Sequence, residues 1–258
     1  MAQPVRRAAV LLLWLLCATA LRAEWRIVSA QPEGTGAGGV VHLVTQAEEV
    51  ESGERATLHL AIFSSKSATL RVIDDPEVDD SLGAIMPREN CVAGVNGGYF
   101  APDYAPVGLL VSDGRSVAPL RKAKLLSGVV SVAGGRVQIQ RPGEFSMKAK
   151  PSAARQCGPF LVERARAIAG LNDTRRARRT FVATSGSDRA AIGYCSHVTL
   201  AQLGELLATP GVAGDFKMQR ALNLDGGSSS GFWFAGENGV FTVREQKRVR
   251  DYLGVVPK

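Results

Sequence analysis

The sequence predicts an α+β fold, a mostly antiparallel or mixed β-sheet with a few flanking helices in a single domain. The chain has 258 residues, and the roughly 235 that follow its N-terminal leader are enough for one large domain with a substantial core. Short runs of β-branched and alternating apolar residues recur along the chain, and several are joined by glycine-containing turns. Only one clear segment has helical periodicity. Strands therefore outnumber helices, and the hairpins favour antiparallel pairing.

The first element is a leader, residues 1–23. It begins with Arg6 and Arg7, continues with an apolar run over Ala8–Leu16 and ends in small residues, which is typical of a cleaved signal peptide. The apolar run is well short of the roughly 20 residues that span a bilayer. We therefore expect an exported protein, periplasmic or secreted, with no stable membrane insertion after signal cleavage.

Residues 24–39 are rich in glycine and polar residues and are predicted to be a flexible N-terminal segment, so the folded domain is expected over 40–258. The first strands of that domain are predicted at 40–46, 56–63 and 68–73. The acidic run that follows, "DDPEVDD", is expected to be a solvated loop, because it lacks the distal bidentate acid of a calcium loop.

Four hairpins are predicted from paired apolar runs around turn residues. Further single strands are expected for "CGPFLVERA", "ALNLD" and "DYLGVV". The clearest helix is "TLAQLGELLATPG", where Thr199 and Gln202 form a capping box and leucines recur at helical spacing. The hairpins are "GLLVSDGRSVAP", "GVVSVAGGRVQIQ", "RRTFVATSGSDRAAIGYC" and "FWFAGENGVFTV".

The composition gives no positive signal for a nucleic-acid partner or a metal site. The formal net charge is +7 and falls to +4 without the leader's three arginines, which does not indicate a nucleic-acid partner and is compatible with an anionic substrate. The three histidines do not have a metal-site spacing, so we expect no cofactor and no metal, although an acid beside a phosphate can recruit a divalent ion. Outside the leader, Cys91, Cys157 and Cys195 allow at most one intramolecular disulfide, and the sequence does not decide which.

The stretch "ALNLDGGSSSGFW" is the first candidate site. Its apolar residues anchor a buried strand, so Asp225 emerges at a fixed position at the strand end. Gly226 and Gly227 permit close approach to the main chain, and the exposed N–H groups up to Ser230 are able to form an anion-binding concavity. The alternative is a tight turn in which Asp225 only caps its own loop.

A second stretch, "VAGVNGGYF", has the same pattern. An apolar run ends in Asn96, two glycines follow, and then aromatic residues. Asn-Gly alone suggests a hairpin, but the prolines of "FAPDYAPVG" come next instead of a partner strand. Two such strand ends that converge would build a binding pocket. Tyr99 and Trp233 are open between core packing and stacking on a sugar, and Glu163 is open between a surface strand and the pocket.

In this order, "GVNGGYF…PVGLLVSDGR", "CGPFLVERAR", "RRTFVATSGSDRAAIGYC", "VTLAQLGELL" and "ALNLDGGSSSGFWF" resemble the phosphodiester glycosidase family. The resemblance covers about residues 90–258. It implies a glycoside hydrolase that cleaves a glycosidic bond in a sugar phosphodiester or a related envelope glycan. The catalytic residues it implies are Asp225, Asn96 and Arg179. The substrate-binding residues are Gly97, Gly98, Tyr99, Thr180, Gly226, Gly227, Ser228 and Ser229.

This chemistry is consistent with the residue types. Cleavage at the anomeric carbon expels a phosphate monoester, a weakly basic leaving group that needs less protonation than an alkoxide, so the usual second carboxylate matters less. One carboxylate, Asp225, would act as nucleophile or general base. Arg179 is a planar, bidentate partner for the phosphate. Asn96 is expected to bond a sugar hydroxyl or to orient Asp225.

Two other hypotheses remain open at this point. A non-catalytic carbohydrate-binding or envelope-assembly module would keep the same pocket without turnover. A purely structural exported protein would use both glycine loops only as turns, and Asp225, Asn96 and Arg179 would then lie far apart. The position of these three residues in the fold separates the hypotheses.

Overall fold

The structure is a computed structural model that describes residues 24–186 and 188–258. The predicted signal peptide, residues 1–23, lies outside the described residues. Among the helices that are described, none is both long enough and apolar enough to cross a membrane.

The described chain forms three β-sheets, and every strand pairing in them is antiparallel. In spatial order, the eight-stranded sheet contains β1 (Trp25–Gly36), β2 (Val40–Glu49), β3 (Arg55–Ser64), β14 (Arg189–Val198), β13 (Ala177–Thr184), β15 (Arg220–Asn223), β11 (Phe160–Glu163) and β12 (Arg166–Ala167). One five-stranded sheet contains β7 (Arg115–Ala118), β6 (Leu110–Ser112), β10 (Ala153–Cys157), β8 (Gly128–Ala133) and β9 (Arg136–Gln140). The other contains β17 (Gly239–Val243), β16 (Phe232–Gly236), β5 (Ala93–Asn96), β18 (Asp251–Pro257) and β4 (Ala68–Asp74).

The described residues form only two α-helices, α1 (Leu82–Arg88) and α2 (Leu200–Ala208), and short 3-10 turns at Ala37–Gly39, Met147–Ala149 and Gly227–Ser229. The fold is therefore mostly β, and the expected α+β class overstated the helical part. The capping box of α2 is confirmed: the Thr199 hydroxyl accepts from the N–H of Gln202, whose side chain accepts from the N–H of Thr199. Helix α1 was not predicted, because seven residues give too short a periodic pattern.

The prediction of a flexible segment at 24–39 is wrong for most of its length. Residues 25–36 form β1, which pairs with β2 through two register irregularities, one of them between Pro32 and Gly34. Proline and glycine reduce strand propensity, but an edge strand with bulges accommodates both. Tertiary pairing has overridden the local composition here.

The predicted hairpins are confirmed. The first turns at Asp113-Gly114 and the second at Gly134-Gly135, all four residues having positive φ. Such angles match the right-handed twist of the paired strands. The other two hairpins are formed by β13 with β14 and by β16 with β17.

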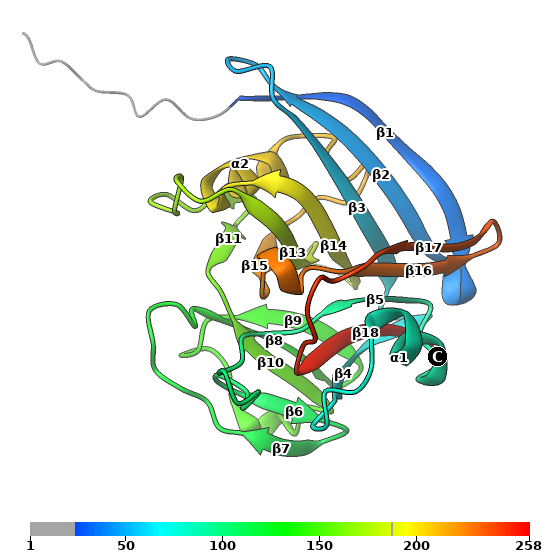
Figure 1. The fold of residues 1–258 in the computed structure, drawn as a ribbon, viewed down its shortest axis with the longest axis vertical. Coiled ribbons are helices and arrows are strands. Elements are labelled where there is room, and N and C mark those ends of the chain that lie inside the picture. Colours follow the sequence, from blue (N-terminus) through cyan, green and yellow to red (C-terminus); the bar gives the residue numbers. More distant parts are fainter. Residues whose placement is uncertain (1–23, 187) are drawn as a thin grey trace, which may run out of the picture.

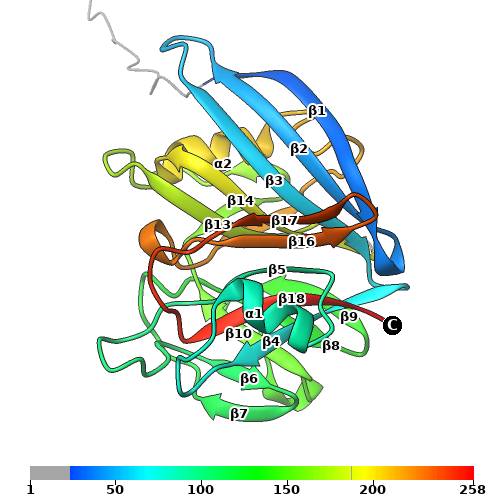
Figure 2. The same cartoon turned by 45° about the vertical axis from the view of Figure 1, so that its right-hand side comes forward.

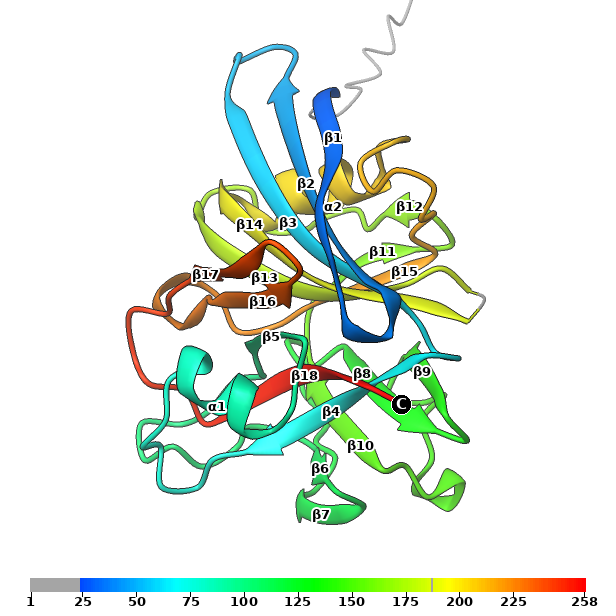
Figure 3. The ribbon, with the colours of Figure 1, turned by 90° about the vertical axis from the view of Figure 1, so that its right-hand side faces the viewer.

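The three sheets share one core. A single apolar cluster contains Phe63 of β3, Val130 of β8, Leu222 of β15 and Phe232 of β16. Figure 1 shows the eight-stranded sheet in the upper part of the view and the two smaller sheets below it. The β16–β17 hairpin is the part of its sheet that lies next to the eight-stranded sheet, as Figure 2 shows from a second side. In Figure 3 one end of the β2–β3 pair extends beyond the rest of the molecule.

Candidate active site

Asp225, Asn96 and Thr180 come together where β15 and β5, strands of two different sheets, end. Asp225 follows β15, Asn96 is the last residue of β5, and Thr180 lies on β13 beside β15. The Asn96 carboxamide donates to the main-chain oxygen of Asp225 at 2.8 Å. The Thr180 hydroxyl lies 2.9 Å from that same oxygen and 2.9 Å from Asn96 Oδ1. These bonds fix the backbone of Asp225, so Asn96 acts as an orienting group in this structure.

The Asp225 carboxylate points into its own loop. It accepts from the N–H of Gly226 at 2.9 Å and from the Ser229 hydroxyl at 2.5 Å. The residue is half-buried. Burial raises the pKa of the Asp225 carboxyl, while Ser229, Lys247 and the Gly226 N–H act in the opposite direction. A raised pKa is common for catalytic carboxyls because it strengthens the ionised form as a base.

Arg179 brings a positive charge to the same loop. Its side chain lies on β13 and is only 8% exposed. Nε donates to the oxygen of Val198 at 3.3 Å, and Nη2 to the oxygen of Arg175 at 2.7 Å. A Cβ added to Gly226 would lie 3.3 Å from Arg179 Nη1, so this nitrogen lies next to the Asp225 loop.

No carboxylate of the described residues lies within ion-pair distance of Arg179. Burial lowers the pKa of its guanidinium, but arginine stays protonated in proteins. An almost buried cation without an anionic partner is costly. An anion bound at this loop would remove that cost.

Gly97 and Gly98 pack between the Asp225 loop and a buried ion pair that the sequence did not indicate. The N–H of Asp225 donates to the oxygen of Gly97 at 3.1 Å. Arg155 and Asp251 are both fully buried and form two parallel hydrogen bonds of 3.0 Å. A Cβ on Gly97 would lie 1.7 Å from Asp251 Oδ1, and one on Gly98 would lie 2.6 Å from Arg155 Cζ. The glycines thus permit the close approach of this pair. A role in substrate binding for them stays a prediction.

Tyr99 is fixed in the core by its hydroxyl. The hydroxyl donates to the oxygen of Gly158 at 2.5 Å and lies 3.2 Å from Asn223 Nδ2. Burial raises the pKa of this phenol. Tyr99 is partly buried and packs against the largest core cluster, and its role in substrate binding stays a prediction. Trp233 is buried, at 5% exposure, in another core cluster.

The segment after β17 braces the Asp225 loop and was also missed. The N–H groups of Gln246 and Lys247 donate to the oxygen of Ser228 at 2.7 and 3.2 Å. The Lys247 ammonium lies 4.7 Å from the centre of the Phe100 ring, and its charge acts on the pKa of Asp225. Arg178 Nε donates to the oxygen of Gly227 at 3.3 Å. These cations had no signal beyond a basic composition.

Other candidates lie elsewhere. Glu163, the last residue of β11, forms a salt bridge with Arg141 at 2.8 Å. Arg176 is paired with Glu54. The three cysteines of the described chain are buried and unpaired, and burial raises the pKa of each thiol to about 12. Such thiols are not nucleophilic.

The arrangement combines one carboxylate, a neighbouring guanidinium and a loop of N–H and hydroxyl donors. Ser228 is the exposed residue of this loop, and Gly226 and Gly227 are partly exposed. Within residues 24–186 and 188–258, no cluster of three or more histidine, cysteine or acidic side chains is arranged to hold a metal ion. Chemically, the site is suited to an anionic ligand that also presents an electrophilic carbon to Asp225.

Three solved structures share the fold of this chain. Their sequence identities are low, so they show the fold alone. The catalytic domain of zebrafish N-acetylglucosamine-1-phosphodiester alpha-N-acetylglucosaminidase, auto-inhibited by its pro-peptide, matches with a TM-score of 0.59 and 13% identity, over 93% of this chain and 85% of that one. A hypothetical protein from Synechocystis matches with a TM-score of 0.58 and 14% identity, over 89% and 64% of the two chains. A putative exported protein from Burkholderia pseudomallei matches with a TM-score of 0.56 and 12% identity, over 81% and 75%.

No curated protein sequence matches this chain. The family model described as phosphodiester glycosidase matches residues 89–256, which include both glycine loops, Arg179 and the buried ion pair. This match covers more than half of the chain and agrees with the resemblance seen in the sequence. The chain belongs to the phosphodiester glycosidase family.

Proposed function

We propose that this protein is an exported hydrolase that cleaves the bond between an anomeric carbon and a phosphate oxygen in a sugar phosphodiester or a related envelope glycan. Asp225 is the nucleophile or general base, and Arg179 with the 226–229 loop holds the phosphate. The family supports a glycosidase-type reaction. The zebrafish structure with the same fold is an N-acetylglucosamine phosphodiester glycosidase by name.

The observation that carries this proposal is that the Asp225 carboxyl and the Arg179 guanidinium both lie next to Gly226. The Asp225 carboxyl accepts from the Gly226 N–H, and the unpaired Arg179 guanidinium lies next to the same residue. A plain glycoside would leave the buried cation uncompensated. A phosphodiester supplies the missing anion and places its sugar carbon beside the only acid of the loop.

The residues divide the reaction between them. Asp225 either takes a proton from the attacking water or attacks the anomeric carbon itself, in which case water then hydrolyses the glycosyl ester and frees the carboxylate. The C–O bond breaks, and its electron pair leaves with the phosphate oxygen. Arg179 and the loop N–H groups stabilise the charge that develops on this oxygen. Asn96 and Thr180 hold the Asp225 backbone at its position.

The direct test is turnover of a UDP-sugar by the purified protein and by Asp225→Asn. We expect the wild type to release the free sugar and the variant to lose about 10²–10⁴-fold in kcat, the usual effect of removing an acid–base group. Asp173→Asn, an exposed residue of the loop before β13, is the matched control and should keep full activity. Full activity in Asp225→Asn would exclude the assigned role.

Binding measurements separate this proposal from a non-catalytic module. A module would bind the UDP-sugar without turnover, and Asp225→Asn would bind it with unchanged affinity. The hydrolase instead releases sugar, and its Asp225→Asn variant keeps a bound but uncleaved substrate, because Arg179 and the loop are intact.

A further inference from the structure

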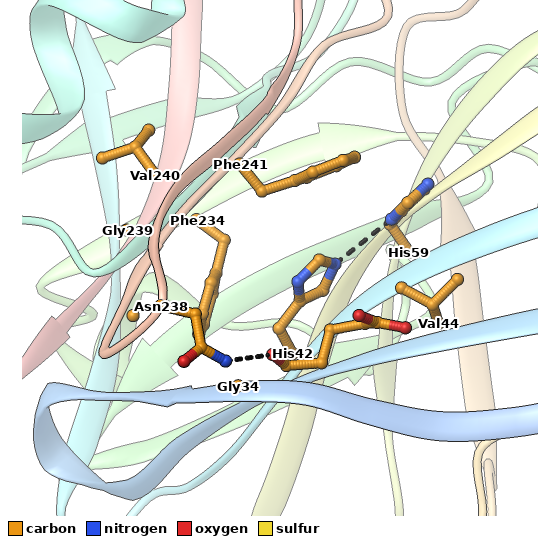
Figure 4. A pocket seen from close by; sticks show the side chains of 11 residues that line it. Gly34, His42, Val44, His59, Phe234, Asn238, Gly239, Val240 and Phe241 are labelled. Atoms are coloured by element: carbon orange, nitrogen blue, oxygen red, sulfur yellow. Dashed lines mark hydrogen bonds between the residues drawn. The ribbon is translucent and has the colours of Figure 1, made fainter.

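A cavity lies at the opposite end of the β16–β17 hairpin from the Asp225 loop. Its volume is about 370 Å³, and it is bounded by β1, β2, β3 and the hairpin turn. Figure 4 shows His42 and His59 side by side, with Phe234, Phe241 and Asn238 around them. The cavity shares no residue with the Asp225 site. Four strand residues lie between Gly231 and Gly236 at the hairpin turn, and the two glycines are therefore roughly 16 Å apart along the extended chain.

Two neutral histidines form the polar floor of this cavity. His42 Nε2 and His59 Nδ1 are 3.2 Å apart and share one hydrogen bond. Burial lowers the pKa of both rings to about 4, so the pair is uncharged at neutral pH. His42 is 3% exposed, and its Nδ1 has no hydrogen-bond partner among the residues that the structure describes.

The direction of the bond shared by the two rings determines whether His42 Nδ1 is a donor or an acceptor. A neutral imidazole has one donor and one acceptor nitrogen. If His42 Nε2 donates to His59, His42 Nδ1 carries no proton and accepts. If His59 Nδ1 donates to His42, the proton of His42 is on Nδ1, which then donates. A hydroxyl group satisfies either state because it both donates and accepts, whereas a carboxylate or an ammonium satisfies only one.

Aromatic rings supply the walls. The Phe241 ring stacks on His59 with centroids 4.5 Å apart, and Phe234 lies 5.0 Å from His42. Phe241 is 36% exposed and its neighbour Val240 is 62% exposed. Aromatic walls around a few polar groups are typical of small-molecule binding sites.

The rim carries acceptors and a negative charge. Glu33 is exposed, and none of the ion pairs among the described residues includes it. Asn238 Nδ2 donates to the main-chain oxygen of Glu33 at 2.8 Å, which leaves Asn238 Oδ1 as an acceptor. This carboxylate disfavours anions, so the cavity does not duplicate the phosphate site at Arg179.

We propose that this cavity is a second carbohydrate site, which binds a neutral saccharide of one or two rings. Hydroxyl groups of the sugar bond His42, Glu33 and Asn238, and its C–H face packs on Phe241. The volume is within the range of small-molecule sites, about 300–1,000 Å³. The assignment does not depend on Asp225 or on the proposed reaction.

The test uses Asp225→Asn protein, so that turnover at the other site does not interfere. Methyl glucoside, methyl mannoside, N-acetylglucosamine, cellobiose and maltose are titrated while the side-chain nitrogen resonances of His42 and the amides of Gly34 and Gly239 are followed by NMR. We expect saturable shifts for at least one saccharide. Phe241→Ala and Glu33→Gln should each weaken binding about tenfold or more.

The controls are Val50→Ala and Glu51→Gln, which change exposed residues in the β2–β3 turn and should leave binding unchanged. Thermal melts confirm that each variant is folded. Binding of choline or of inorganic phosphate without any response to the saccharides would overturn the proposal. It would also be overturned if no saccharide shifted these resonances at 50 mM, or if Phe241→Ala bound as well as its parent.

Discussion

The two glycine loops of this protein have the same sequence pattern and opposite roles. Each follows a buried strand and presents a polar side chain and two glycines, Asn96-Gly97-Gly98 in one case and Asp225-Gly226-Gly227 in the other. The first loop is fully buried, whereas the second is partly exposed. The pattern therefore identifies a place where strand ends converge, and burial distinguishes the loop that is packed in the interior from the loop that is open to solvent.

The reason for each glycine follows from this difference. A Cβ on Gly97 would overlap the Asp251 carboxylate, while one on Gly227 would meet no heavy atom within 4 Å. Gly227 is needed for its positive φ of 66°. Two identical dipeptides thus meet two different physical requirements, close packing and backbone conformation.

The largest effect is expected for Gly97→Ala. The added methyl group would force apart the Gly97 backbone and the buried Arg155–Asp251 pair, and breaking such a pair costs about 3–5 kcal/mol. Urea unfolding followed by circular dichroism measures this loss. A variant with wild-type stability would show that the first loop is not the tightly packed support described above.

A smaller effect is expected for Arg179→Lys, which keeps the charge of the second loop but removes the planar guanidinium. We expect kcat/KM for a UDP-sugar to fall about 10–100-fold, with little change for a neutral nitrophenyl glycoside. Arg176→Lys is the control, since Arg176 is paired with Glu54 at the surface. Equal losses on both substrates would contradict a role in phosphate binding.

Gly227→Ala should cost about 1–2 kcal/mol, because alanine adopts a left-handed conformation only with strain. Its free energy of unfolding, measured beside that of Gly97→Ala, gives the sharpest contrast between the loops. Equal destabilisation by both substitutions would remove the distinction between packing and conformation.

The acid limb of the pH profile tests the second loop alone. Burial raises the pKa of Asp225, so activity should be lost on acidification at a higher pH than for an exposed aspartate. The folded state then binds this proton more tightly than the unfolded state, and the contribution of Asp225 to stability decreases as pH rises through the raised pKa. Asp225→Asn should therefore be at least as stable as the wild type at neutral pH.

Lys247→Met removes the cation that lowers the pKa of Asp225. The acid limb of the kcat/KM profile should therefore move to higher pH. An unchanged acid limb would show that Lys247 does not act on Asp225.

Much of the fold was predictable because its turns are local. Gly134-Gly135 and Asp113-Gly114 specify their hairpins through backbone angles that few residues adopt. Strand β1 and helix α1 were missed because pairing with β2 and packing against β5 and β16, not local pattern, form them. The order of strands in the sheets depends on contacts between distant residues, which a single sequence does not carry.

The meeting of Asp225 and Asn96 was predictable in a similar way, because both follow the same sequence pattern at a strand end. The family resemblance added Arg179 and Thr180, which also lie beside the Asp225 loop, and the catalytic and binding roles of all four residues stay predictions. The Arg155–Asp251 pair joins residues 96 positions apart, and neither has a neighbouring signal. Lys247 is equally unmarked, because a lysine among other basic residues is usually a surface charge.

The position of bond cleavage tests the central claim most directly. The purified protein is incubated with a UDP-sugar in ¹⁸O-labelled water, and the products are separated and weighed by mass spectrometry. If Asp225 acts at the anomeric carbon, the label enters the released sugar and the phosphate stays unlabelled. Label in the phosphate would show cleavage of a P–O bond and would contradict the glycosidase account.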